Sequence, residues 1–239
     1  MTMSNCIERM LFGLIFTTLL IAPQAFGDDL SSEQWRVYNR VFTPSLWDIN
    51  KAARASQGVS FPINVFVAVD AGSFAVYLMN NYNKDLTKKE TISAMFNWSQ
   101  TSYHTRSGSG GYVRIWFQDV ASGPYDSNDY WWCHSASVTT FDVSLNDTVA
   151  AAGTTLSCNL NDRSQWMNQA GRYADDTTEN WTDWTGAIVT MSPYNGFDRA
   201  KKNVKQLGLA FGGPPGSYAS GFAADVVPAT FNMTSYTIN

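Results

Sequence analysis

The stretch VSFPINVFVAV, residues 59–69, alternates apolar side chains with others and decides the fold class. Every odd-numbered residue from Val59 to Val69 is apolar, and in an extended chain these residues share one face. A period of two is typical of a half-buried β-strand rather than of a helix. We therefore expect a strand over residues 59–69, with this face in the core.

The same alternation recurs along the chain, in segments separated by turn-rich stretches. Neither an internal repeat nor a linker divides these segments. The pattern predicts an all-β fold with about nine or ten strands, a two-sheet antiparallel sandwich that we interpret as a jelly roll. Besides residues 59–69, the expected strands are Phe74–Met79, Ile92–Trp98, Tyr112–Val120, Ser137–Leu145, Ala187–Met191, Val204–Phe211, Gly221–Val227 and Thr230–Ile238.

Residues 28–57 are the less regular part of the expected domain. Two segments within them, Ser31–Phe42 and Leu46–Ser56, could be helical, and Ser31 could form a capping box with Gln34. The apolar residues of the first segment fit a strand equally well. We expect a short irregular or helical segment here, and no long amphipathic helix anywhere in the chain.

The first 27 residues have the organisation of a cleavable signal peptide. Arg9 lies in a mostly polar start, Leu11–Ala22 is an uncharged apolar run, and Ala25 and Gly27 supply small residues for cleavage. The apolar run of about 12 residues is shorter than the roughly 20 that a membrane span needs, so a retained anchor is the less favoured alternative. We expect residues 28–239 to form a single secreted, periplasmic or extracellular domain without a membrane anchor.

The net charge and the cysteine content of this domain bear on its partners and on its covalent cross-links. The formal net charge is −4 with 15% charged residues, which argues against nucleic acid as a partner. Cleavage would remove Cys6 and leave Cys133 and Cys158. In an oxidising compartment these two most simply form one disulfide, with two buried free thiols as the alternative.

The segment YVRIWFQ, residues 112–118, carries the first candidate binding surface. Its apolar alternate residues would face the core, which leaves an aromatic, a cation, an aromatic and an amide on the other face. Aromatic rings stack on the C–H face of a sugar, while arginine and amide groups bind its hydroxyls. The alternative is that the tryptophan packs beneath a loop. The candidate residues are Tyr112, Arg114, Trp116 and Gln118.

Two further aromatic clusters could contribute to the same kind of site. They are residues 125–134 and Asn180–Trp184. In a strand, Trp131 and Trp132 would point to opposite faces, so one of them is expected in the core. For the second cluster, a loop folded over the edge of the sandwich is the alternative. The ligand-binding residues predicted from these clusters are Tyr130, Trp131, Trp181 and Trp184.

Signals for catalysis are sparse. The sequence contains no G-x-S-x-G, H-E-x-x-H, P-loop or G-x-G-x-x-G motif, so we assign no catalytic residue. A glycoside hydrolase needs only two carboxylates across a cleft, and the acidic residues leave that alternative open.

Charged loop residues give no firm cofactor assignment, and we expect none. Two pairs of loop carboxylates, Asp126 with Asp129 and Asp175 with Asp176, could supply oxygen ligands to a structural calcium, although such loops are usually only solvated. A basic run is interpreted as an exposed turn rather than an anion site; it consists of Arg199, Lys201, Lys202 and Lys205.

The C-terminal part of the sequence resembles the last strands of galactose-binding-like jelly rolls, the fold of many carbohydrate-binding modules. The resemblance rests on Val204–Gly213 before a Gly/Ser loop, on Ala229–Ile238, and on Trp181–Trp184 leading into Ala187–Met191. Members of that fold bind glycans without catalysis and often hold a structural calcium. The paired acidic residues that commonly precede their last strand are absent here, and no ligand residue is carried over.

We therefore expect an exported, non-catalytic β-sandwich that binds a glycan or polysaccharide through exposed aromatic and polar side chains. Two alternatives stay open on the sequence alone. One is a secreted polysaccharide-degrading hydrolase or lyase that uses a carboxylate pair. The other is a structural or adhesive extracellular protein without a small ligand.

Overall fold

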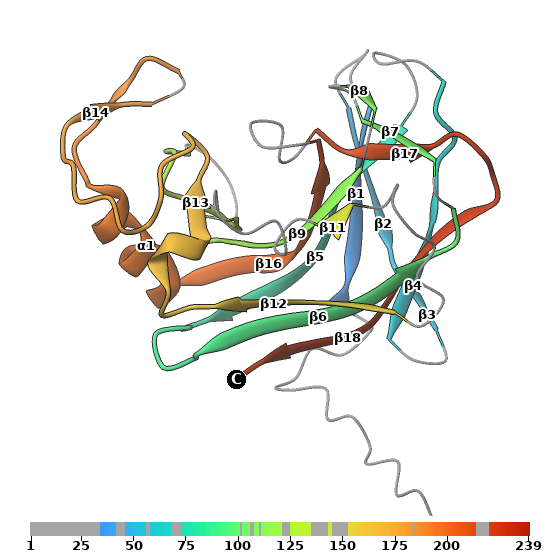
Figure 1. The fold of residues 1–239 in the computed structure, drawn as a ribbon, viewed down its shortest axis with the longest axis horizontal. Helices are drawn as coiled ribbons and strands as arrows, with labels where there is room; N and C mark the ends of the chain where they lie inside the picture. Colours follow the sequence, from blue (N-terminus) through green and yellow to red (C-terminus); the bar gives the residue numbers. More distant parts are fainter. Residues whose placement is uncertain are drawn as a thin grey trace, which may run out of the picture.

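The computed structural model is dominated by strands, which form two antiparallel sheets and confirm the expected all-β sandwich (Figure 1). The predicted signal peptide, residues 1–27, and Trp184 lie outside the described residues. In the described part, no helix is both long enough and apolar enough to cross a membrane. The structure describes residues 34–41, 46–55, 58–67, 73–100, 102–105, 108–109, 111–120, 125–134, 143–144, 153–183, 185–213 and 220–239.

The larger of the two sheets, here the large sheet, contains 11 described strands. Its main path runs β13-β10-β9-β16-β5-β17-β7-β8, while β1 pairs with β5 and β2, and β11 pairs with β9. The strands are β1 (Arg36–Val41), β2 (Leu46–Lys51), β5 (Ser73–Lys84), β7 (Tyr103–Thr105), β8 (Gly108–Ser109), β9 (Tyr112–Gln118), β10 (Tyr130–Cys133), β11 (Val143–Ser144), β13 (Trp166–Asn168), β16 (Val204–Gly212) and β17 (Phe222–Ala224).

The second sheet, here the small sheet, has five described strands in the order β12-β6-β18-β4-β3. Figure 1 shows β12, β6 and β18 layered beneath β16 and β5 of the large sheet. A separate two-stranded hairpin joins β14 (Trp181–Thr182) to β15 (Ile188–Val189). The small-sheet strands are β3 (Ala53–Arg54), β4 (Val59–Ile63), β6 (Thr91–Trp98), β12 (Thr154–Asn159) and β18 (Ala229–Ile238).

The core between the sheets is built from the alternating residues that the sequence predicts. Val113, Ile115 and Phe117 of β9 are fully buried there. In β4 the odd-numbered residues are buried, but Val65 and Val67 are exposed, so the expected strand over residues 59–69 is too long. The chain leaves the small sheet after Ile63 and makes only an isolated bridge from Val65 to Ala224.

The N-terminal part of the described chain is extended rather than helical. β1 and β2 pair over six residues each, and β1 also pairs with β5. Burial of Trp35 and Val37 in the core explains why the strand alternative is the correct one, because alternate residues of β1 face the other sheet. The helical interpretation of Ser31–Phe42 and Leu46–Ser56 is therefore wrong where the structure describes these segments.

A disulfide joins Cys133 of β10 to Cys158 of β12, with 6.2 Å between their Cα atoms. It links the large sheet to the small sheet and confirms the predicted pairing. Both cysteines are fully buried in the core.

We expect the double replacement of Cys133 and Cys158 by alanine to lower the free energy of unfolding by about 3–4 kcal/mol. The bond closes a loop with a sequence separation of 25 residues, and its loss restores conformational freedom to the unfolded chain. Urea unfolding of the oxidised protein and of the variant would measure the difference. A change below about 1 kcal/mol would contradict a stabilising role for this bond.

The single described α-helix, α1 (Pro193–Lys202), is absent from the sequence-based prediction. The Ser192 hydroxyl caps it by accepting a hydrogen bond from the Asn195 amide at 3.3 Å, and Pro193 occupies its first turn. The basic run predicted as an exposed turn therefore lies partly in the last turn of a helix, and Lys201 is buried, with Nζ donating to the Leu160 carbonyl at 3.0 Å.

Candidate binding site

The first predicted surface, on β9, is not exposed. Arg114 is 0% and Trp116 1% exposed, and Gln118 is also buried, while Tyr112 is half-buried. The expectation that these residues form an open sugar-binding face is therefore wrong. The physical reason is a second hydrophobic cluster on the outer face of the large sheet, made of Met79, Trp116, Trp132 and Ala210 with Tyr38, Tyr77 and Tyr130 packed against it.

The polar residues of this strand make structural hydrogen bonds. Arg114 Nη2 donates to the Gly213 carbonyl at 2.8 Å, and its guanidinium lies over the Tyr112 ring. Gln118 Nε2 donates to the Val120 carbonyl at 2.7 Å and also contacts the Gln206 amide. These contacts tie β9 to β16 and to the chain that follows each strand.

Two of the predicted tryptophans, Trp131 and Trp181, are buried and support neighbouring segments instead of facing a ligand. The Trp131 indole N–H donates to the Asn128 carbonyl at 2.7 Å, and its buried ring packs edge-on against Phe197 of α1. The Trp181 indole N–H donates to the Met191 carbonyl at 3.0 Å and fastens the β14–β15 hairpin to the start of α1. Trp132 is buried in the outer cluster, so both tryptophans of the adjacent pair are covered.

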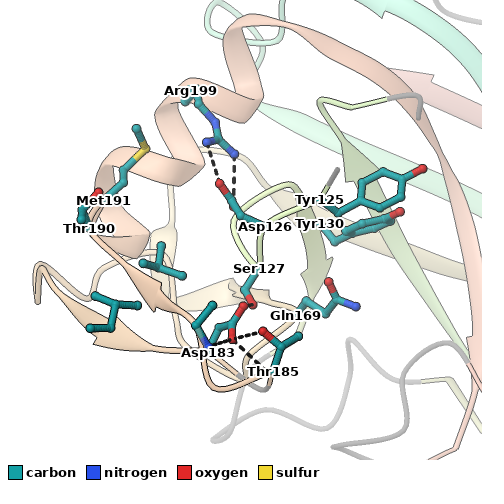
Figure 2. A pocket seen from close by; sticks show the side chains of 13 residues that line it. Tyr125, Asp126, Ser127, Tyr130, Gln169, Asp183, Thr185, Thr190, Met191 and Arg199 are labelled. Atoms are coloured by element: carbon teal, nitrogen blue, oxygen red, sulfur yellow. Dashed lines mark hydrogen bonds and ion pairs between the residues drawn. The ribbon is translucent and has the colours of Figure 1, made fainter. Parts of the chain in front are cut away.

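A pocket of about 540 Å³ opens where four segments meet (Figure 2). The segments are the chain from Tyr125 into β10, the turn after β13 that carries Gln169, the β14–β15 hairpin with its extension, and α1. Among the predicted binding residues that the structure describes, Tyr130 alone lines this pocket. The lining residues are Tyr125, Asp126, Ser127, Tyr130, Gln169, Asp183, Thr185, Ala187, Ile188, Val189, Thr190, Met191 and Arg199.

Two tyrosines form one side of the pocket. The rings of Tyr125 and Tyr130 lie 5.3 Å apart between centroids, and Figure 2 shows them next to each other. Tyr125 is 48% exposed, whereas Tyr130 is half-buried and stacks on Trp132 of the outer cluster. An exposed ring thus stands on a fixed aromatic base, which is the arrangement needed to stack on a flat, weakly polar ligand face.

Asp183, in the turn of the β14–β15 hairpin, forms the opposite side. Its Oδ1 accepts hydrogen bonds from the Thr185 amide at 2.8 Å, the Thr185 hydroxyl at 2.7 Å and the Ala187 amide at 3.0 Å. These bonds, led by that of the Thr185 side chain, lower the pKa of Asp183 and keep it ionised. Within the described chain its Oδ2 has only a 3.5 Å contact with the Ser127 hydroxyl, so this oxygen can accept from a ligand.

At the pocket wall, Arg199 of α1 binds three carboxylates at once. Its guanidinium pairs with Asp119 at 3.0 Å, with Asp126 at 3.1 Å and with Asp129. Asp119 and Asp129 are nearly buried, with side chains 6% and 5% exposed. We call these four residues the Arg199 cluster. Gly196 allows it to form, because a Cβ there would lie 2.5 Å from the Asn128 side chain and push α1 away from the loop.

Burial disturbs the titration of this cluster. Loss of solvation raises the pKa of Asp119 to about 6, against the opposing attraction of Arg199, and it also raises the pKa of Asp129. Burial by itself would lower the pKa of Arg199, but its hydrogen bond and ion pairs with the carboxylates outweigh that effect and raise it. Burial therefore favours protonation of Asp119 and Asp129 in a cluster where three carboxyl groups share one cation.

The folded protein should consequently lose stability as the pH rises through 6. A carboxyl whose pKa is higher in the folded than in the unfolded state binds more protons when folded, so its stabilising contribution fades above its folded pKa. We expect the free energy of unfolding to fall by about 1 kcal/mol between pH 5 and 7.5 relative to Asp119→Asn. Paired urea titrations at the two pH values measure it, and parallel behaviour of both proteins would contradict it.

Three of the four proposed calcium ligands are bound to arginine side chains, and the fourth, Asp175, is exposed. Asp126 and Asp129 bind Arg199, and Asp176 accepts from Arg172 Nε at 2.8 Å. Among the residues that the structure describes, no group of three or more His, Cys, Asp or Glu side chains is placed to hold a metal ion. A guanidinium thus occupies the position among the loop carboxylates where the sequence suggested a cation.

The sequence predicts the two clusters, residues 125–134 and Asn180–Trp184, that contribute to the pocket, but it does not single out Gln169, and it places Arg199 in an exposed turn rather than in the pocket lining. Ser127, Gln169, Asp183 and Arg199 come from four separate segments. Two local signals were present: the spacing of Asp183 and Thr185 is that of a side-chain-capped turn, and Ser192–Pro193 is a helix start. No local signal could show that these segments converge.

Two sequence comparisons with known proteins found no match. The sequence matches no protein-family model, and no curated protein matches it either. The geometry of the pocket is therefore the main indication of function.

Proposed function

We propose that this protein binds carbohydrate in the pocket between α1, the β14–β15 hairpin and the chain leading into β10. The observation that carries the proposal is the composition of the pocket: an exposed tyrosine ring stands opposite polar acceptors and donors in a space of about 540 Å³. A sugar presents a C–H face that stacks on Tyr125 and hydroxyls that suit Asp183, Gln169 and Ser127. A pocket of this size accommodates one or two sugar units.

The pocket is better suited to binding than to glycoside hydrolysis. Hydrolysis needs a general acid with a raised pKa facing the bond that is cleaved. Asp183, which does line the pocket, has a lowered pKa. Asp119 has the raised pKa, but it is nearly buried, bonded to Arg199 and outside the pocket lining. A carboxylate pair in the two required states does not meet in this space.

Two other expectations support the proposal without being tested by the geometry. The predicted signal peptide would place the pocket outside the cytoplasm, where glycans are abundant. The resemblance to galactose-binding-like jelly rolls implies the same kind of ligand. Both stay predictions, and the mass of the mature protein purified from its source would test the first of them, because cleavage would remove residues 1–27.

Replacement of Tyr125 by alanine should weaken glycan binding about ten-fold or more and leave thermal stability nearly unchanged, because the ring is 48% exposed. The measurement is binding to a glycan array followed by calorimetric titration of the best oligosaccharide. Tyr194→Ala is the matched control, since Tyr194 is an exposed tyrosine on α1 outside the pocket lining.

Three outcomes separate the possible functions. Binding that is lost in Tyr125→Ala and kept in Tyr194→Ala supports the proposed site. New reducing ends in a polysaccharide incubated with the protein would show a hydrolase instead, and new unsaturated ends a lyase. An array without binding, together with self-association of the protein, would favour the structural or adhesive reading and overturn the proposal.

A further inference from the structure

The charged side chains around the pocket are strongly unbalanced. Arg199 and two aspartates, Asp126 and Asp183, line it directly, and Asp119 and Asp129 lie behind Arg199 on the same guanidinium. One cation therefore stands against four carboxylates, which leaves three negative charges when all are ionised. The neighbouring cation Arg172 contributes little, because Asp176 is already bonded to its Nε and Nη2.

Of Asp126 and Asp183, which both line the pocket, Asp183 offers a carboxylate oxygen to a ligand. Asp126 uses both oxygens on Arg199 and accepts from the Asn128 amide as well. Asp183 is different, because its Oδ1 is saturated by three donors of its own turn, while its Oδ2 has a 3.5 Å contact with the neighbouring Ser127 hydroxyl (Figure 2). Asp183 Oδ2 is thus an ionised acceptor held in a fixed direction at the pocket wall.

The aromatic side of the pocket also favours a positively charged ligand. A tyrosine face attracts a cation that lies within about 6 Å of the ring. The exposed Tyr125 ring and the ionised Asp183 therefore both favour a positive group over a neutral or negative one. An acidic sugar, in contrast, would meet the excess negative charge of the Arg199 cluster and of Asp183.

We infer that the preferred ligand is a glycan with a free primary ammonium group, such as a 2-amino-2-deoxy sugar unit, whose ammonium binds Asp183 Oδ2. This inference rests on the proposed carbohydrate-binding function and specifies its substrate class. The sugar ring stacks on Tyr125 and the ammonium donates to Asp183, so the charged group selects among glycans while the ring contact supplies affinity common to all of them.

Calorimetric titration with three oligosaccharides of equal length tests this inference: a β-1,4-linked glucosamine oligomer, its fully N-acetylated counterpart and a uronate oligomer. At pH 6 the glucosamine oligomer should bind about ten-fold more tightly than the acetylated one, as expected for one charge-assisted hydrogen bond. The uronate oligomer should bind most weakly. Raising the salt concentration should reduce the difference, because the pocket is open to solvent.

Asp183→Asn should abolish the preference for the glucosamine oligomer over the acetylated one, because an amide oxygen carries no charge to pair with the ammonium group. The amide oxygen can still accept the hydrogen bonds of the turn. Asp175→Asn is the matched control, because Asp175 is an exposed carboxylate outside the pocket lining and its loss changes the net charge equally. Both substitutions create an N-x-T sequence, so the proteins should be produced in a host that does not glycosylate them.

The outcomes distinguish this inference from the function on which it rests. Equal affinity for the glucosamine and acetylated oligomers, or an unchanged preference in Asp183→Asn, would overturn the ammonium site while leaving carbohydrate binding in place. Tightest binding of the uronate oligomer would overturn it in the same way. Failure of all three oligomers to bind, combined with an array without binding, would overturn the proposed function itself.

Discussion

Replacement of Arg199 by methionine should lower the free energy of unfolding by about 3–5 kcal/mol at neutral pH. The guanidinium is the shared partner of Asp119, Asp126 and Asp129, two of which are nearly buried. Methionine keeps much of the side-chain volume but leaves these carboxylates without their cation. Buried carboxylates that lose a partner must either stay charged at a high cost or take up protons.

Acid should partly restore the stability of this variant. Because loss of Arg199 raises the pKa of Asp119 and Asp129 further, the variant binds more protons when folded, and its deficit should shrink as the pH falls from 7.5 to 5. Urea unfolding at both pH values measures the effect. Lys202→Met is the control, because Lys202 is an exposed cation on the same helix. A loss below about 1 kcal/mol for Arg199→Met would show that the cluster does not depend on its guanidinium.

Replacement of Trp116 by alanine should cost about 3–5 kcal/mol of stability, the range found for buried tryptophan. The ring is 1% exposed and lies 4.6 Å from that of Tyr77, while it also stacks on Tyr130. Removal of the indole would leave a cavity in the outer cluster, because the surrounding rings belong to different strands and cannot all move inward. Thermal or urea unfolding measures the loss.

Tyr125→Ala is the control for Trp116→Ala. Tyr125 contacts the same cluster through Tyr130 but is exposed, so its removal should change stability by no more than about 1 kcal/mol. A stability change in Trp116→Ala as small as that would mean that the outer face of the large sheet is accessible, and β9 would again be a candidate binding surface.

The strands of this protein could be predicted because alternation is a local property of the sequence. In YVRIWFQ the apolar set does face the core, as periodicity alone requires. The burial of Arg114 and Trp116 could not be predicted in the same way. Alternation separates two faces of a strand, but it does not reveal whether the second face is covered by other parts of the fold.

Helix α1 and the pocket show a second limit of structure prediction from the sequence. Pro193–Lys202 has few large apolar residues, so its helical period is weak, and its buried side rests on Phe197, Ala200 and small residues. The pocket combines Tyr125, Asp183 and Arg199, which are far apart in the sequence and meet only through the packing of α1 on the loop after β9. Composition could suggest the chemistry of a sugar site, but only tertiary contacts could place it.

The position of β18 sets a condition on how this chain can fold. β18, residues 229–238, lies in the middle of the small sheet, hydrogen-bonded to β6 on one side and to β4 on the other. Until these residues leave the ribosome, β6 and β4 have no common partner, and the small sheet cannot close over the core. Completion of the sandwich therefore has to wait for β18, and the nascent chain must keep its apolar strands from aggregating until β18 is available.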